Sequence, residues 1–250
     1  MSSLRTWARR LIPLAIRQNL AQWRRRWRDY RQGMQFEVCH SQQQRAGYRL
    51  LAEIRQPIMP SALFENKLAN LQQGASRIHR AVLMPRQVWS FWRYVGKPVQ
   101  GNGFVVGRNL VDGQLTRQVG GGLCQLSSML YHLGLCSGLS IVERHPHSID
   151  IYQEHERFTP LGADATVVWG FKDLRMRNLH AVEVMLECEV DGHFLIGRAF
   201  ADGALPQLEV AFERQQLDAR QVLVHTLVNR QPHTQTRYEQ QQGMALQAPN

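Results

Sequence analysis

The chain has 250 residues, of which 44% are hydrophobic, so it is long enough to bury a core without covalent staples. Its four cysteines, at positions 39, 124, 136 and 188, are irregularly spaced and include no Cys-x-x-Cys pair. This pattern argues against a zinc finger or a disulfide scaffold and is typical of a reducing compartment. We expect neither a metal ion nor a cofactor.

The net charge of +10 is concentrated near one end of the chain. Residues 1–33 contain one acid, Asp29, and nine arginines, at positions 5, 9, 10, 17, 24, 25, 26, 28 and 31. This segment supplies +8, which leaves +2 for the rest of the chain. Because the basicity belongs to an arm and not to the surface of the domain, we expect no nucleic acid as a partner.

The arm, residues 1–33, has helical periodicity that Pro13 interrupts. Its apolar positions recur mostly every three or four residues, at Leu4, Trp7, Leu11, Leu14, Ile16, Leu20, Trp23, Trp27 and Tyr30. The pattern predicts a basic amphipathic helix with one apolar, aromatic face and one arginine-rich face. Such a helix lies on an anionic membrane surface, docks on a partner or packs on its own domain, and RNA binding is a less favoured alternative.

Neither a secretory signal nor a membrane-spanning segment is predicted. The apolar run 11–16 is short, Pro13 interrupts it, and no small-residue cleavage site follows. No segment contains the roughly 20 apolar residues that cross a bilayer. We therefore predict a cytoplasmic protein, with peripheral contact at the inner face of the membrane through residues 1–33 as an open alternative.

The rest of the chain predicts an α+β domain over residues 34–230 and a flexible, polar tail over 231–250. In chain order, we expect a strand at 36–40, a helix at 61–80, strands at 87–92 and 103–106, and a hairpin at 109–116. A central helix follows over 125–139, with Cys124 at or near its first turn.

Seven strand candidates come after the central helix, at 140–143, 148–152, 165–169, 181–190, 193–199, 208–212 and 221–228. Sheet also precedes the glycines at 120–122, so a mostly antiparallel sheet should pack on the central helix.

Three glycines, Gly120, Gly121 and Gly122, stand just before Cys124. Glycines let backbone N–H groups turn toward a ligand, and a helix N-terminus carries partial positive charge. Both features stabilise a thiolate and can hold an oxyanion, so a nucleophilic cysteine is expected at this place. The structural alternative is a glycine-rich turn beside a cysteine that only packs.

Histidine and acid follow the cysteine in the chain, at His145, His147 and Asp164. This order makes a thiolate–imidazolium pair oriented by a carboxylate possible. His147 enters a predicted strand whereas His145 precedes a proline, so we favour His147 as the base and keep His145 as the alternative. Asp164 can equally be a turn residue, because Gly162 and Ala163 precede it.

Nucleotide binding is not supported, because no Lys-Ser/Thr follows the glycines and the spacing Gly-x-Gly-x-x-Gly is absent. Arginines can instead bind a substrate carboxylate through paired hydrogen bonds. The candidate substrate-binding residues are Gly120, Gly121, Gly122, Gln125, Ser127, Arg144, Arg175 and Arg177. Two alternatives stay open: the arginines lie in ordinary exposed turns, and Ser127 and Ser128 bond to the helix backbone.

Four segments together resemble the VanW domain, and the resemblance spans about residues 34–200. They are Val119-Gly-Gly-Gly-Leu-Cys-Gln-Leu-Ser-Ser-Met-Leu-Tyr131, Ile141-Val-Glu-Arg-His-Pro-His-Ser148, Gly162-Ala-Asp-Ala-Thr-Val167 and Asp173-Leu-Arg-Met-Arg-Asn178. The family takes its name from glycopeptide-resistance gene clusters of the vancomycin B type. Some members are regarded as L,D-transpeptidases that cross-link peptidoglycan through a cysteine acyl-enzyme. The resemblance therefore implies Cys124 as nucleophile, His147 as base and Asp164 as orienting group.

The leading hypothesis is a VanW-like protein that performs cysteine-dependent acyl transfer or hydrolysis on a peptide related to peptidoglycan. Cross-linking takes place outside the cytoplasm, so a chain without an export signal would act on a soluble cell-wall precursor peptide. The rival is a non-catalytic accessory or peptide-binding protein associated with glycopeptide resistance or the cell envelope. The oligomeric state is not predicted.

Overall fold

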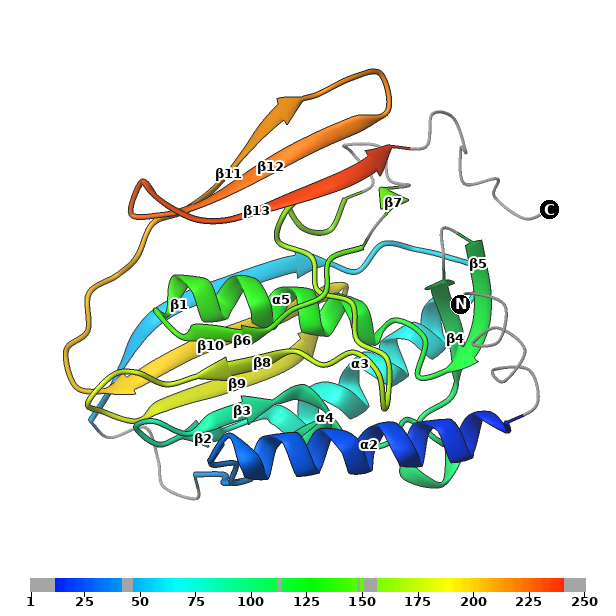
Figure 1. Ribbon diagram of the computed structural model, residues 1–250, viewed down its shortest axis with the longest axis horizontal. Helices are drawn as coiled ribbons and strands as arrows, with labels where there is room; N and C mark the ends of the chain where they lie inside the picture. The colour runs from blue at the N-terminus through cyan, green and yellow to red at the C-terminus, as the bar shows by residue number, and fades with distance from the viewer. Residues whose placement is uncertain (1–11, 42–46, 112–113, 148, 151–156, 241–250) are drawn as a thin grey trace.

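The computed structural model describes residues 12–41, 47–111, 114–147, 149–150 and 157–240 (Figure 1). It confirms the α+β class with mostly antiparallel sheets and a few helices. The main sheet has the order β1-β10-β9-β2, formed by β1 (Tyr48–Pro57), β10 (Phe194–Asp202), β9 (Val184–Asp191) and β2 (Ala81–Leu83), and every pair in it is antiparallel.

The predicted central helix is α5 (Leu123–Cys136), which contacts β1 and β10 of the main sheet. Its residues Leu126, Met129, Leu130 and Leu133 are fully buried. Gly197 of β10 leaves room for the Met129 side chain, since a Cβ there would come within 2.7 Å of the Met129 methyl group. The predicted helix at 61–80 is α3 (Phe64–Ile78), which packs on β9 and on α5. The apolar side chains between these helices and the sheet form the core.

A smaller sheet, β3-β8-β6, consists of β3 (Val88–Ser90), β8 (Arg175–Arg177) and β6 (Ser140–Glu143). The strand expected at 87–92 ends at Ser90 because the Ser90 hydroxyl accepts from the Arg93 amide and caps the short helix α4 (Phe91–Val95). The short 3₁₀ helix η1 (Gln100–Asn102) precedes the hairpin of β4 (Val106–Val111) and β5 (Gln114–Val119). The expected strand at 103–106 thus begins only at Val106.

The C-terminal sheet has the order β11-β12-β13-β7, and Figure 1 shows β11–β13 as a separate layer above α5. Its strands are β11 (Val210–Gln216), β12 (Gln221–Val228), β13 (Gln231–Gln240) and β7 (Ile149–Asp150). Residues 231–240 therefore form a paired strand instead of the start of a flexible tail. Thr236 and Tyr238 alternate with exposed side chains and point inward, a period of two that the polar composition hides. Residues 241–250 lie outside the described part.

Two expected strands are not formed. At 36–40 only His40 makes a single bridge, to Ala81, and the Phe36 ring lies beneath the guanidinium group of Arg93 at 4.0 Å. At 165–169, side chains of α5 satisfy the backbone of Ala165 in place of a neighbouring strand: its amide donates to Ser128 Oγ at 2.9 Å and its carbonyl accepts from Ser127 Oγ at 2.6 Å.

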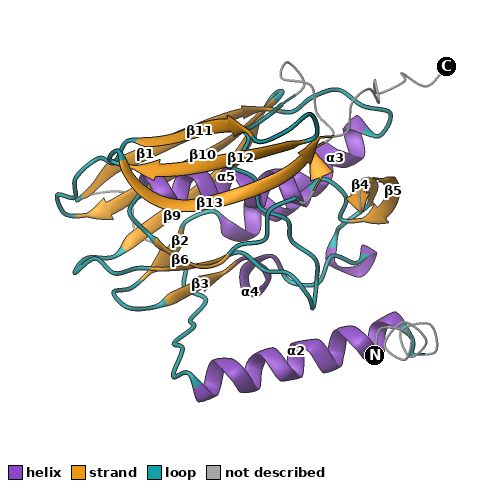
Figure 2. Ribbon diagram, turned by 45° about the horizontal axis from the view of Figure 1, so that its top comes forward, coloured by secondary structure: helices purple, strands orange, loops and turns teal. Residues whose placement is uncertain are grey.

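The helix of the basic arm is α2 (Leu14–Arg31), which begins after Pro13. In Figure 2 it lies along one side of the molecule, outside the sheets. Residues 1–11 of the arm are not described. In the described part of the chain, no helix combines the length and the apolar character needed to cross a membrane.

Candidate active site

The glycine run sits where the β4–β5 hairpin meets the start of α5. Gly120 and Gly122 have φ angles of 81° and 101°, which favour glycine. A Cβ at Gly121 would overlap the carbonyl of Gly107 and lie 2.7 Å from the next amide nitrogen. The Asn70 amide group donates to the Gly121 carbonyl at 2.9 Å. The glycine run therefore allows the backbone at Gly121 to pack directly against the backbone of β4 at Gly107. It also places Cys124 in the first turn of α5.

The first turn of α5 is tied to the segment that carries Asp164. Ser128 Oγ donates to the Cys124 carbonyl at 2.7 Å and accepts from the Ala165 amide, while Ser127 Oγ donates to the Ala165 carbonyl. Both serines are fully buried. The two hydroxyls thus bridge the backbone of Cys124 to that of Ala165, the residue after Asp164. This agrees with the alternative in which Ser127 and Ser128 bond to backbone groups and do not bind substrate.

Cys124, His147 and Asp164 come together from three separate segments and are called the triad below. The His147 ring Nδ1 lies 2.8 Å from Asp164 Oδ2, and the His147 backbone amide donates to the same oxygen at 2.6 Å. The Cys124 side chain lies close enough to the imidazole to raise the pKa of His147, and its thiol donates to the Val167 carbonyl at 3.9 Å. Because Nδ1 is engaged by Asp164, Nε2 is the ring nitrogen left for the thiol, as in other nucleophile–His–acid sites.

His145 points elsewhere. Its Nε2 lies 2.9 Å from Glu143 Oε1, and Glu143 also accepts from Arg25 of α2. The structure thus brings His147, and not His145, to the thiol.

Asp164 is held in turn by side chains that approach from two directions. Arg144 donates to its carboxylate at 2.9 Å and to its carbonyl at 2.8 Å. The Tyr238 hydroxyl donates to the same carboxylate and accepts from Arg144, which also donates to Thr236 Oγ1 at 2.7 Å. These contacts are internal and the Arg144 side chain is 8% exposed, so they suit an arginine that positions Asp164.

The charges of the triad follow from these contacts. Burial raises the pKa of Asp164, but the hydrogen bond from His147 and the charge of Arg144 outweigh it and lower the pKa to about 2. Burial lowers the pKa of His147, but hydrogen bonds to Asp164 and Cys124 and their charges outweigh it and raise the pKa to about 10. At neutral pH Asp164 is therefore a carboxylate and His147 an imidazolium, so a positive charge faces the Cys124 side chain.

Cys124 and His147 open onto a cleft of about 1230 Å³. Its other walls come from α2, from Asn109 and Gln118 of the β4–β5 hairpin, and from the segment 166–172. Two acids line it, Asp29 and Glu143, against six basic side chains: Arg17, Arg24, Arg25, Arg28, Lys172 and Arg175. The cleft is therefore positively charged and larger than the roughly 300–1,000 Å³ of most small-molecule pockets.

Comparison with known proteins matches residues 66–200 to the family described as VanW like protein. The chain belongs to the VanW family. It is 32% identical over 138 residues to the Vancomycin B-type resistance protein VanW of Enterococcus faecalis (strain ATCC 700802 / V583), covering 55% of this chain and 50% of the relative. It is 32% identical over 127 residues to YoaR of Bacillus subtilis (strain 168), covering 51% of this chain and 40% of that protein. No solved structure matches it.

The chain thus spans half or less of the length of these two curated relatives. The VanW match includes the three triad residues but not α2 or the C-terminal strands β11–β13. Three features of the site were missed in the sequence. They are the support of Asp164 by Tyr238 and of Arg144 by Thr236, the cleft wall formed by α2, and the buried hydroxyl of Thr166, which lines the cleft without a hydrogen-bond partner among the described residues. The alternation of inward side chains at 236 and 238 was an available signal for the first.

The remaining sequence-predicted residues lie in different surroundings. Gln125 is 2% exposed and donates its amide to the Pro57 carbonyl at 2.9 Å. Arg175 lines the cleft, but it donates to both oxygens of Asp29, at 2.7 and 3.1 Å. Arg177, on β8, is not among the cleft residues. Among the described residues, no group of three His, Cys, Asp or Glu side chains is placed to hold a metal ion.

Proposed function

We propose that the VanW-family domain of this protein is a cysteine acyltransferase or hydrolase, with Cys124 as nucleophile, His147 as acid and base, and Asp164 as orienting group. The single observation that carries the proposal is the position of His147. It bonds to the Asp164 carboxylate and lies beside the Cys124 thiol, at the wall of a large cleft. This is the arrangement that nucleophilic catalysis by a thiol requires.

The reaction follows from these contacts. The Cys124 thiolate attacks a substrate carbonyl carbon, and the C=O electrons move to the oxygen. The intermediate then breaks its C–N bond as the His147 imidazolium gives its proton to the leaving amine, which leaves an acyl thioester on Cys124. Neutral His147 next takes a proton from water, for hydrolysis, or from an acceptor amine, for transfer. Attack by that group breaks the C–S bond and restores the thiolate and imidazolium.

Thr166 supplies a donor for the oxyanion. It lines the cleft with Cys124 and His147, and its hydroxyl is buried without a hydrogen-bond partner among the described residues. A buried hydroxyl without a partner is costly unless a ligand satisfies it. The N-terminus of α5 adds partial positive charge beside the thiol.

The proposed substrate is a peptide related to peptidoglycan that carries carboxylates. The size of the cleft suits a segment of several residues, and its excess of basic side chains suits carboxylate groups. The relationship to a vancomycin resistance protein supports a link to the cell envelope. In keeping with the expectation from the sequence, the proposed form of this substrate is a soluble precursor peptide in the cytoplasm.

Alkylation of Cys124 tests the activated thiol. Burial raises the pKa of Cys136 to about 11 and that of Cys188 further, so only Cys39 needs replacement, by Cys39→Ser. In this background we expect Cys124 to react with iodoacetamide at mildly acidic pH, and His147→Gln to slow the reaction roughly tenfold or more. The matched control is His145→Gln, which leaves the triad intact and should not slow it. Equal rates in all three proteins would refute the activated thiol.

Catalysis itself is tested by mass spectrometry of the intact protein with carboxylate-bearing wall peptides. We expect an acyl adduct on Cys124 that Cys124→Ser lacks, together with a released amine. The rival function is a binding module that uses the same basic cleft without chemistry. Peptide binding that survives Cys124→Ser, with no adduct in the unaltered protein, would establish that rival.

A further inference from the structure

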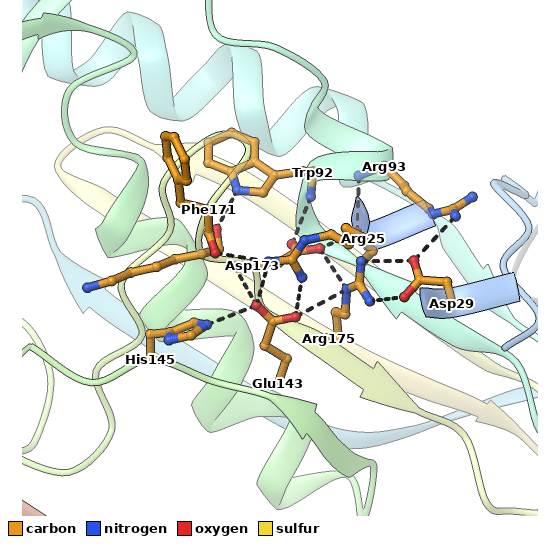
Figure 3. Close-up of polar contacts among 11 residues, drawn as sticks. Arg25, Asp29, Trp92, Arg93, Glu143, His145, Phe171, Asp173 and Arg175 are labelled. Atoms are coloured by element: carbon orange, nitrogen blue, oxygen red, sulfur yellow. Dashed lines mark hydrogen bonds and ion pairs between the residues drawn. The ribbon is translucent and has the colours of Figure 1, made fainter. Parts of the chain in front are cut away.

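The helix α2 docks on the domain through its polar face. Arg25 bonds to Glu143 and donates to the Phe171 carbonyl at 2.9 Å, and Asp29 accepts both hydrogen bonds from Arg175. Figure 3 shows these side chains turned toward one another, with Arg93 beside Asp29. Asp29 is 3% exposed, so the contact excludes water. The side of α2 that faces the protein is thus charged.

The opposite side of α2 is apolar and open to solvent. Its residues follow one another at intervals of three or four along the helix, which places them on one face: Ile16, Trp23, Trp27 and Tyr30, with Leu20 at its border with the cleft. Trp23 is 64% exposed, Trp27 52% and Tyr30 84%. A surface helix normally turns its apolar face to the core and its charged face to water. In α2 the two faces are reversed, and no other element of the described part of the chain covers the apolar face.

We propose that this apolar face of α2 binds the surface of an anionic membrane. Tryptophan and tyrosine combine an apolar ring with a polar tip and are enriched where lipid meets water. Arginines border the face, with Arg26 on one flank and Arg31 on the other, and the Arg31 guanidinium lies 4.8 Å from the centre of the Trp27 ring. An apolar, aromatic stripe bordered by arginines is typical of helices that lie in a membrane interface.

The charge of α2 favours a lipid surface over a second copy of the chain. The helix carries six arginines against one acid, Asp29, which is already paired with Arg175. Two such helices placed face to face would bring their arginines together and repel each other. An anionic bilayer attracts the arginines instead, and each one near the surface raises the affinity about fivefold. The apolar rings supply the part of the binding that salt does not screen.

Membrane binding through α2 would also hold the cleft close to the lipid headgroups. The inner side of α2 lines the cleft with Arg17, Arg24 and Arg28, and a helix is about 10 Å across. The cleft would thus lie within roughly one helix diameter of the lipid headgroups. The inference is independent of the proposed acyl transfer, since it uses no property of the triad.

The test is co-sedimentation of the full chain with vesicles. One set contains equal parts of phosphatidylglycerol and phosphatidylcholine, and the other contains phosphatidylcholine alone. We expect binding to the first set, weakened by added salt, and a loss of roughly tenfold or more in the double variant Trp23→Ser, Trp27→Ser. The matched control is Leu179→Ser, a residue that is also 64% exposed but lies outside α2, which should bind as the unaltered protein does.

Cys124→Ser should bind vesicles normally, so failure of the chemistry leaves this test intact. Sedimentation velocity of the same variants detects self-association. A dimer that the double tryptophan variant abolishes, without vesicle binding, would overturn the proposal in favour of a second copy. Absence of both, or vesicle binding that the variant retains, would overturn it outright. The replaced side chains are exposed, so circular dichroism should report an unchanged fold.

Discussion

Raising the pH from neutral into the alkaline range should remove a defined part of the stability of this protein, through His147. Its pKa rises from 6.5 to about 10 on folding because its hydrogen bonds and charge contacts with Asp164 and Cys124 outweigh the effect of burial. A group whose pKa is raised by folding contributes in full below its unfolded pKa and loses that contribution as the pH passes its folded pKa. The contribution is therefore complete below pH 6.5 and gone above about pH 10.

The magnitude follows from the shift. Because one pKa unit corresponds to ~1.4 kcal/mol, a rise from 6.5 to about 10 makes this contribution of the order of several kcal/mol, which is large beside the ~5–15 kcal/mol that keeps a typical domain folded. Urea unfolding across the range measures it directly. We expect the unaltered protein and His145→Gln to lose stability steeply as the pH rises, and His147→Gln to show a much flatter profile. Parallel profiles for His147→Gln and the unaltered protein would refute the reasoning.

Two further predictions concern the support of the triad. Gly121→Ala should destabilise the protein by about 3 kcal/mol or prevent folding, because the new Cβ would overlap the backbone of the neighbouring hairpin. The control is Gly101→Ala, whose Cβ would meet open space, and urea unfolding compares the two variants. Tyr238→Phe should cost about 1–3 kcal/mol in the same assay, because the triad carboxylate loses a buried hydrogen bond. It should also raise the pKa of His147 measured by NMR, because a carboxylate with one donor fewer stabilises the imidazolium more strongly. An unchanged pKa of His147 in Tyr238→Phe would show that Tyr238 does not influence the triad.

Local patterns predicted the elements whose contacts are local. The helices α3 and α5 were readable because apolar residues recur at helical spacing, and the β4–β5 hairpin because a turn dipeptide separates two apolar runs. The strand β1 was missed, since a register shift between Leu50 and Ala52 breaks its period of two. The strand β13 was missed because its inward positions are Thr236 and Tyr238, which composition alone counts as polar.

The candidate site shows the same division. The place of Cys124 could be predicted because it depends on neighbours in the chain, namely the glycines that precede it and the helix that follows. The support of Asp164 could not, because Tyr238 lies 74 residues further along the chain and reaches Asp164 only after the C-terminal sheet has formed. Arg175 was predicted to bind substrate because a free arginine suits a carboxylate, but tertiary structure supplies Asp29 as its partner.

By itself, the sequence determined the α+β class, the VanW family, the cysteine at the start of the central helix, and the concentration of arginines in residues 1–33. Each of these depends on residue types and short spacings, which the chain carries before it folds. Only the tertiary structure decided that His147 and not His145 meets the thiol, and that α2 turns its charged face inward. Those outcomes depend on partners more than 15 residues away, Asp164 for the histidine and Glu143 and Arg175 for the helix, and no local periodicity encodes them.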